Sequence, residues 1–236
     1  MKILILAAHP DDEVLGMGGT IKKLSNAGNE IKIIFMSTGI LARRNNTNKS
    51  SKQVFTNEWM KKNEKKISSL RNDAKKAGNI LGVKDIEFMD FPDNEMDMVS
   101  TLVVTKSIEN SIDIFKPTIV YTTPEIDVNV DHKKVFDATL VATRPKKKSK
   151  VEQVISYEIP SSSEWFFPEQ FSPNIFENIE KEFSSKIRAI KSYKNELMEF
   201  PHPRSVDALE SIAKRWGTVS GYKYAEAFKL IRLLKK

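Results

Sequence analysis

The stretch KILILAAHPDDEVLGMGGTIKKLSNAGNEIKIIFMST, residues 2–38, decides the fold. Its two ends, residues 2–8 and 30–38, are short, apolar and rich in isoleucine, which is typical of buried strands. The segment between them has apolar side chains at helical spacing and then a glycine stop, at Leu15, Ile21, Leu24 and Gly28. A strand, a helix and a second strand in this order form a βαβ unit. We therefore predict that the two strands are parallel, with a right-handed crossover.

The rest of the chain continues this alternation. Further strands are expected at 85–91, 117–123 and 151–159, with helices at about 61–80, 98–115 and 132–143. The last third changes character, and its apolar spacing predicts amphipathic helices at 174–197, 205–217 and 222–234. The expected fold class is α/β and Rossmann-like, a single domain over residues 1–236. It has a mostly parallel sheet, helices on both faces and a helical carboxyl-terminal third.

Composition narrows the classes of function. The 236 residues include no cysteine, which excludes disulfides and thiolate metal sites and fits a cytoplasmic location. No run of about 18 apolar residues occurs, and the amino terminus lacks the order of a signal peptide, so stable membrane insertion is not expected. The net charge of +7 is spread along the chain without a basic module interleaved with aromatics, which disfavours nucleic acid as a partner. Such a field equally helps to gather an anionic small substrate.

A cluster of polar residues stands where the first strand ends. The run HPDDE, His9 to Glu13, places three consecutive acids at the mouth of a helix, where carboxylates repel one another. Asp131 and His132 follow the strand at 117–123 and therefore belong to the same edge of the sheet, where open parallel sheets bind ligands. Taken singly, the acids can be helix caps and His132 an ordinary helix residue. Together, in a chain without cysteine, they favour a bound cation.

The residue types also indicate a kind of chemistry. Two imidazoles and one carboxylate leave coordination positions open for water and substrate, which is the catalytic arrangement for zinc. A second carboxylate beside the metal can take a proton from that water. The glycines of GMGG, at 16, 18 and 19, resemble a dinucleotide fingerprint only superficially, because they follow acids that would repel a pyrophosphate.

At these residues the sequence resembles a known family. AHPDDE after a first strand and DVNVDH (127–132) are similar to the two motifs of the PIG-L or LmbE-like zinc-dependent deacetylases, which remove acetyl groups from N-acetylglucosamine-type substrates. The segments STGILARR, RNDAKKAGNILGV and FPDNEMD fit the family's course through the sheet. IPSSSEW (159–165), PHPRS (201–205) and GYKYAEAF (221–228) look like the carboxyl-terminal part of a bacterial subgroup.

The resemblance implies roles for particular positions. His9, Asp12 and His132 would ligate zinc, with Fe²⁺ as another ion that such ligands accept. Asp11 would be the general base, and Asp131 would orient a group near the reacting carbonyl. Many family members have a histidine where this chain has Asn129. An amide can donate a hydrogen bond to an oxyanion but cannot act as a general acid, so the amine's proton must come from Asp11 or another group.

Candidate substrate contacts are less specific. Arg43 or Arg44 would hold a hydroxyl or phosphate, or else be solvated. Trp165, beside Ser161 to Ser163, would offer a face to a sugar ring, or else only pack. His202 is the spare histidine, with an active-site role or a surface role.

The function expected is removal of the N-acetyl group from an N-acetylated amino sugar, which is free or linked to a nucleotide, lipid or glycoside. The chain is expected to act alone or as a homo-oligomer. The alternatives are an amidase for a different acyl group and a basic nucleotide- or nucleic-acid-binding protein.

Overall fold

The computed structural model describes residues 1–40, 56–146 and 150–235. Seven strands form one sheet in the order β3-β2-β1-β4-β5-β7-β6. The strands are β1 (Lys2–Ala7), β2 (Glu30–Ser37), β3 (Asp85–Phe91), β4 (Ile119–Thr122), β5 (Gln153–Tyr157), β6 (Ile175–Asn178) and β7 (Ala225–Leu233). The longer helices are α1 (Asp12–Asn26), α2 (Asn57–Leu81), α3 (Thr101–Phe115), α4 (Val130–Ala142), α5 (Phe183–Ile190) and α6 (Val206–Ser220).

The sheet is parallel over its first five strands and antiparallel at the other edge. β1 pairs in parallel with β2 and β4, and β2–β3 and β4–β5 extend the parallel part on the two sides. β7 then pairs antiparallel with both β5 and β6. The order β3-β2-β1-β4-β5 is that of a Rossmann-like sheet, so the predicted α/β fold class is confirmed.

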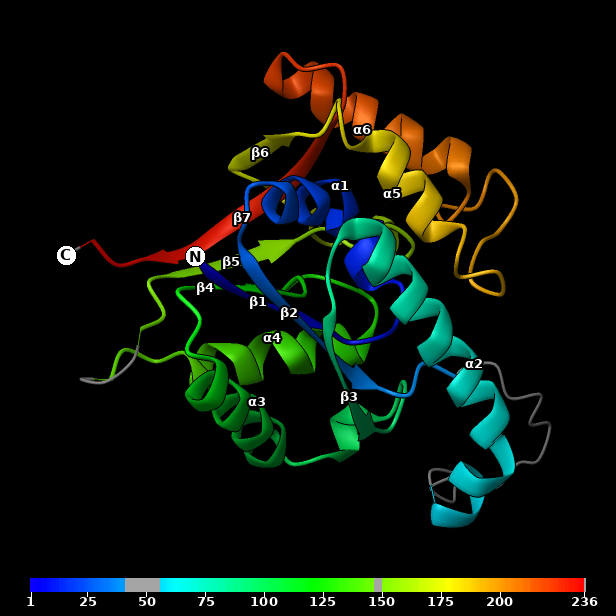
Figure 1. Ribbon diagram of the computed structural model, residues 1–236, viewed down its shortest axis with the longest axis vertical. Coiled ribbons are helices and arrows are strands. Elements are labelled where there is room, and N and C mark those ends of the chain that lie inside the picture. The colour runs from blue at the N-terminus through cyan, green and yellow to red at the C-terminus, as the bar shows by residue number, and fades with distance from the viewer. Residues whose placement is uncertain (41–55, 147–149, 236) are drawn as a thin grey trace.

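Alternating side chains of β1 build two cores. Ile3, Ile5 and Ala7 point to the core beneath α1, α2 and α5, whereas Leu4 and Leu6 point to the core beneath α3 and α4. Both faces of the sheet are therefore covered by helices, as Figure 1 shows, and the continuous apolar run of this strand is explained by its burial on both sides.

Two of the three helix predictions for the last third of the chain are wrong. Residues 222–234 form the long strand β7, and 174–197 divide into strand β6 and the short helix α5. Only the prediction at 205–217 is confirmed, by α6. Phe176 belongs to strand β6, and the centroid of its ring lies 5.9 Å from that of Trp216. It therefore does not continue the apolar face of α5. β7 is held by hydrogen bonds to β5 and β6, and such non-local pairing overrides a local helical period.

The glycines of helix α1 allow other segments to approach it closely. A Cβ on Gly16 would lie 2.3 Å from the carbonyl oxygen of Glu158, and one on Gly19 would lie 2.8 Å from Ile179. The helix is kinked at Met17, and Glu226 of β7 accepts hydrogen bonds from the freed N–H groups of Gly19 and Thr20. These glycines therefore serve packing around the helix that begins at Asp12.

Candidate metal centre and active site

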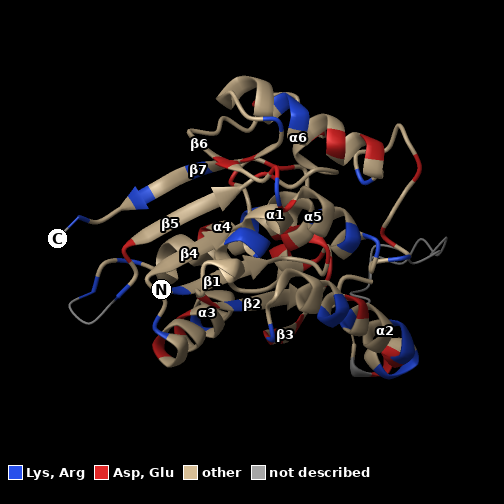
Figure 2. Ribbon diagram, turned by 45° about the horizontal axis from the view of Figure 1, so that its top comes forward, with Lys and Arg blue, Asp and Glu red and all other residues tan. Residues whose placement is uncertain are grey.

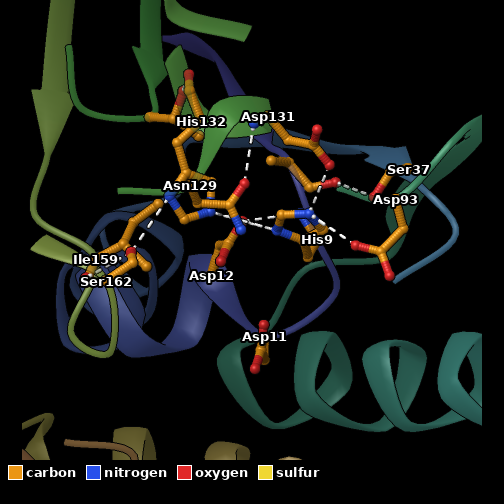
Figure 3. Close-up of polar contacts among 12 residues, drawn as sticks. His9, Asp11, Asp12, Ser37, Asp93, Asn129, Asp131, His132, Ile159 and Ser162 are labelled. Carbon is orange, nitrogen blue, oxygen red and sulfur yellow. Dashed lines mark hydrogen bonds and ion pairs between the residues drawn. The ribbon is translucent and has the colours of Figure 1, made fainter. Parts of the chain in front are cut away.

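The acids and histidines meet at the carboxyl ends of β1 and β4. His9 follows β1, and Asp11 occupies the N-cap position of α1 without a capping hydrogen bond from its side chain. The first turn of this helix holds Asp12 and Glu13. His132 lies in the first turn of α4, which follows β4, and its side chain points toward His9 (Figure 3). The two motifs are more than 110 residues apart in sequence, and the parallel pairing of β1 with β4 brings them together.

Three donor atoms form a compact triangle. The Oδ2 atom of Asp12 lies 3.4 Å from Nδ1 of His9 and 3.3 Å from Nε2 of His132, and the two nitrogens are 3.3 Å apart. Donor atoms around a tetrahedral ion, at bond lengths of about 2.0–2.1 Å, are separated by about 3.3–3.4 Å. The spacing and the chemistry of this donor set therefore fit a divalent metal ion such as zinc.

Carboxylates behind both histidines set their orientation. Nε2 of His9 lies 2.9 Å from Asp131 and 3.1 Å from Asp93, and Nδ1 of His132 lies 2.9 Å from Asp127. One ring N–H of each histidine, shared between Asp131 and Asp93 for His9 and directed at Asp127 for His132, leaves the other nitrogen of that ring with its lone pair toward the triangle. Asp131 is itself fixed, because it accepts hydrogen bonds from the backbone N–H groups of Asn94 and Met96, at 2.6 and 3.0 Å.

The electrostatics of the cluster favour a cation. Burial opposes the charged form of both imidazoles, but the carboxylates outweigh it. Asp12, Asp131 and Asp93 raise the pKa of His9 well above its ordinary value, and Asp12 and Asp127 raise the pKa of His132 to about 9. Burial alone would raise the pKa of Asp12, yet the two histidines hold it far below its usual range. A buried group of negative charges that binds protons so firmly is also suited to a metal ion.

The three consecutive acids have different partners. Asp12 belongs to the triangle, whereas Asp11 lies apart from it in Figure 3 and accepts a hydrogen bond from Nη1 of Arg204 at 3.2 Å. The carboxyl of Glu13 receives hydrogen bonds from the Tyr193 hydroxyl at 2.6 Å and the Asp11 N–H at 3.1 Å. Burial raises the pKa of Glu13 to about 8, which favours the neutral form of this carboxyl at pH 7 and reduces its part in the repulsion.

An inner cavity of about 410 Å³ opens over the triangle. Its lining includes Asp11, Asn129 and Arg204 as well as the three donor residues. Of the four non-glycine residues with positive φ in the described part of the chain, three line this cavity: Asp11 (127°), Asn94 (56°) and Ser161 (100°). Unfavourable backbone conformations concentrate at functional sites, which supports the inner cavity as the active site.

Comparison with known proteins decides the family. The sequence profile of "PIG-L: GlcNAc-PI de-N-acetylase" matches residues 4–143, more than half of the chain and all of the donor residues. The chain belongs to this family.

Individual proteins are similar to this PIG-L family chain over more of its length than residues 4–143. It is 28% identical over 201 residues to the "Uncharacterized deacetylase YaiS" of Escherichia coli K12, covering 82% of this chain and 90% of that protein. It is 26% identical to the diacetylchitobiose deacetylase of Thermococcus kodakarensis, covering 98% of this chain and 83% of that protein. The solved structure of the conserved protein TT1542 from Thermus thermophilus superimposes with a TM-score of 0.75 at 20% identity, covering 99% of this chain and 96% of that one.

Some of the other residues predicted from the sequence line the inner cavity of this PIG-L family chain, and others do not. Asn129 caps α4 and lines the inner cavity, and Ser161 and Ser162 also line it. Trp165 and His202 contact each other, with ring centroids 5.8 Å apart, but neither lines the inner cavity. Arg43 and Arg44 lie outside the described residues.

Sequence reasoning missed three residues of the site. Asp93 and Asp127 orient the two histidines, and Arg204 contacts Asp11. Each belongs to a segment quoted for the family resemblance, FPDNEMD, DVNVDH or PHPRS, but no spacing within those segments indicates which partner they contact. In the described part of the chain, no helix is both long and apolar enough to cross a membrane.

Proposed function

We propose that this protein is a zinc-dependent hydrolase that removes the N-acetyl group from an N-acetylated amino sugar. The observation that carries the proposal is the triangle of His9, Asp12 and His132, with a further carboxylate, Asp11, in the same cavity. Membership of the PIG-L family and the deacetylase names of the relatives support the reaction class. Because nitrogen and oxygen donors accept several divalent ions, Fe²⁺ is the alternative metal to test.

The proposed chemistry assigns separate tasks to the side chains. His9, Asp12 and His132 hold the ion, which when bound supplies a Lewis acid that polarises the acetyl carbonyl and lowers the pKa of water. Asp11 takes a proton from the water while the oxygen of that water bonds to the acetyl carbon. When the carbon–nitrogen bond breaks, Asp11 returns that proton to the departing amine. The products are acetic acid and the free amino sugar. The amine then takes the proton of the acid, which gives acetate and an ammonium group, so atoms and charge balance.

Asn129 and Asp131 act on the geometry of the reaction in this proposal. The Asn129 side chain accepts the Asp131 N–H at 2.9 Å through its oxygen and donates to Oδ1 of Asn94 at 3.2 Å through its nitrogen. That nitrogen carries a second hydrogen, which is available to an oxyanion in the inner cavity. Asp131 keeps the ring of His9 in position.

A substrate panel tests the reaction class. The zinc- and iron-loaded protein is incubated with N-acetylated sugars, free and as nucleotide, lipid and simple glycoside conjugates, and both free amine and acetate are measured. His132→Ala is the control, which we expect to lose the metal and the activity while remaining folded. Release of a longer acid in place of acetate would favour the amidase alternative. Salt-sensitive oligonucleotide binding that persists after chelation, with no hydrolysis, would favour the nucleic-acid alternative.

A further inference from the structure

An outer cavity of about 510 Å³ adjoins the inner one. Asn195 and Glu196, which follow α5, line both cavities and form their common wall. In addition, Gly39 lines the inner cavity and the next residue, Ile40, lines the outer one. Two separate segments of the chain therefore place the cavities next to each other.

The turn at Gly39 lies where the two cavities adjoin. Gly39 has a φ of +71°, and a Cβ there would lie 2.8 Å from Pro10, which lines the inner cavity, and 3.0 Å from Leu70, which lines the outer one. Glycine thus allows the walls of both cavities to meet at this turn.

Among the described residues, the charges that line the outer cavity are unbalanced. Its two acids already have cationic partners: Asp73 pairs with Lys76 at 2.9 Å, and Glu196 pairs with Arg204 at 3.1 Å. Lys65 and Lys66 of α2 also line the cavity, are exposed, and form no ion pair with any residue that the structure describes. The segment 41–55 contains no Asp or Glu in its sequence, so it offers these lysines no carboxylate.

The remaining lining suits an organic group. The half-buried Trp59 and the apolar side chains of Ile40 and Leu70 provide a non-polar surface beside the two lysines. Figure 2 shows the concentration of basic residues along α2, the helix on which Trp59, Lys65 and Lys66 lie. A non-polar surface next to unpaired cations matches a ligand part with a hydrocarbon body and a negative charge.

We propose that the outer cavity binds the group to which the N-acetylated sugar is attached, and that this group is anionic. Lys65 and Lys66 attract its negative charge, and Trp59 packs against its body. The inference rests on the proposed deacetylase function, because it places the sugar in the inner cavity. It makes a conjugate with a carboxylate or a phosphodiester, rather than a free or neutral sugar, the preferred substrate.

Three glycosides of N-acetylglucosamine test this preference. One has a neutral methyl aglycone, one an aglycone with a carboxylate, and one an aglycone joined through a phosphodiester. For the metal-loaded wild type we expect a KM about three- to tenfold lower for an anionic glycoside than for the neutral one, at similar kcat, since exposed ion pairs contribute modestly. The difference is expected to shrink as salt is raised. Comparison of the two anionic glycosides identifies the source of the charge.

Charge variants on α2 locate the effect. Lys65→Gln with Lys66→Gln is expected to raise the KM of the anionic glycosides to that of the neutral one, while the KM of the neutral glycoside stays the same. The matched control, Lys61→Gln with Lys62→Gln, removes the same charge from the same helix outside the outer cavity, and is expected to keep the preference. Trp59→Ala is expected to weaken binding of every glycoside with a bulky aglycone, whatever its charge.

The outcomes separate this inference from the proposed function. Turnover of all three glycosides with equal KM, or equal effects of the two lysine pairs, would overturn the anionic subsite and leave the deacetylase function standing. If no glycoside is hydrolysed, the proposed function fails. Equilibrium dialysis of the same glycosides with the metal-loaded Asp11→Asn protein then still tests the subsite, because it measures binding without turnover.

Discussion

The side chains of the acid run differ in their neighbours, and this difference assigns their work. Asp12 contacts both histidines, Glu13 is a buried carboxyl whose pKa is raised, and Asp11 lies in the cavity beside Arg204. Replacement of Asp11 by Asn is expected to leave the metal content unchanged and to lower kcat by about 10²–10⁴-fold, the usual contribution of a positioned general base. Elemental analysis and steady-state kinetics check both parts. A variant that instead loses its metal would require the roles of Asp11 and Asp12 to be exchanged.

Asn129 combines a structural and a proposed chemical contribution, and two substitutions separate them. Serine keeps an oxygen that can cap α4 but lacks the amide donor, whereas alanine lacks both. We expect Asn129→Ser to lower kcat by about 10²–10³-fold, the cost of one oxyanion donor, with little change in Tm. Asn129→Ala should show the same kinetic loss and in addition lose about 1 kcal/mol of stability. Wild-type kcat in the serine variant would assign Asn129 to the helix cap alone.

At the level of secondary structure, the α1 helix depends on close approach of its neighbours. Gly19→Ala should improve helix propensity by about 1 kcal/mol, but its Cβ would overlap Ile179, whose side-chain atoms lie 2.8–2.9 Å away. Overpacking costs about 1–3 kcal/mol, so we expect a net fall in the free energy of unfolding, measured by urea denaturation. The double variant with Ile179→Ala provides the control. If the two changes add without coupling, the contact between α1 and the segment before α5 does not limit the residue at 19.

The elements differ in how far their sequences determine them. β1, α1 and β2 could be predicted because their apolar periods are local and continuous, and β1 is buried on both faces. The carboxyl-terminal strands could not, because β7 is stabilised between β5 and β6, its distant partners in sequence. The same limit applies to the site. His9, Asp12 and His132 follow from strand ends that share an edge, whereas the contact between Arg204 and Asp11 joins residues 193 apart.

The molecule as a whole carries a net charge of +7 but gathers buried carboxylates around two histidines. Asp93, Asp127 and Asp131 are buried beside the two histidines, whereas Lys65 and Lys66 of α2 are exposed and form no ion pair with any residue that the structure describes. In the proposed function, this separation of charge gives a substrate a cationic approach to the candidate metal site. It favours a substrate whose neutral acetamido group reaches the centre while its charged end stays outside.

The stability of the whole molecule should depend on pH through Glu158, at the turn that contacts α1 and α6. Burial raises the pKa of this carboxyl to about 7, although a hydrogen bond from Trp216 at 2.6 Å acts in the opposite direction. The ordinary pKa of 4.5 applies to the unfolded chain, so between pH 4.5 and about 7 the folded state holds a proton that unfolding releases. The contribution of Glu158 to stability is therefore greatest below pH 4.5, falls as pH rises, and is fully lost above pH 7.

Glu158→Gln isolates this contribution from those of the other buried groups. Glutamine stays neutral and retains an oxygen for the Trp216 N–H, so the variant should gain stability over the wild type as pH rises from 4.5 to 7. The gain is expected to level off above pH 7 at a few kcal/mol at most, since each pKa unit corresponds to about 1.4 kcal/mol. Urea denaturation of both proteins across this range measures the difference. A difference that is constant with pH would show that Glu158 ionises at the same pH in the folded and unfolded chain.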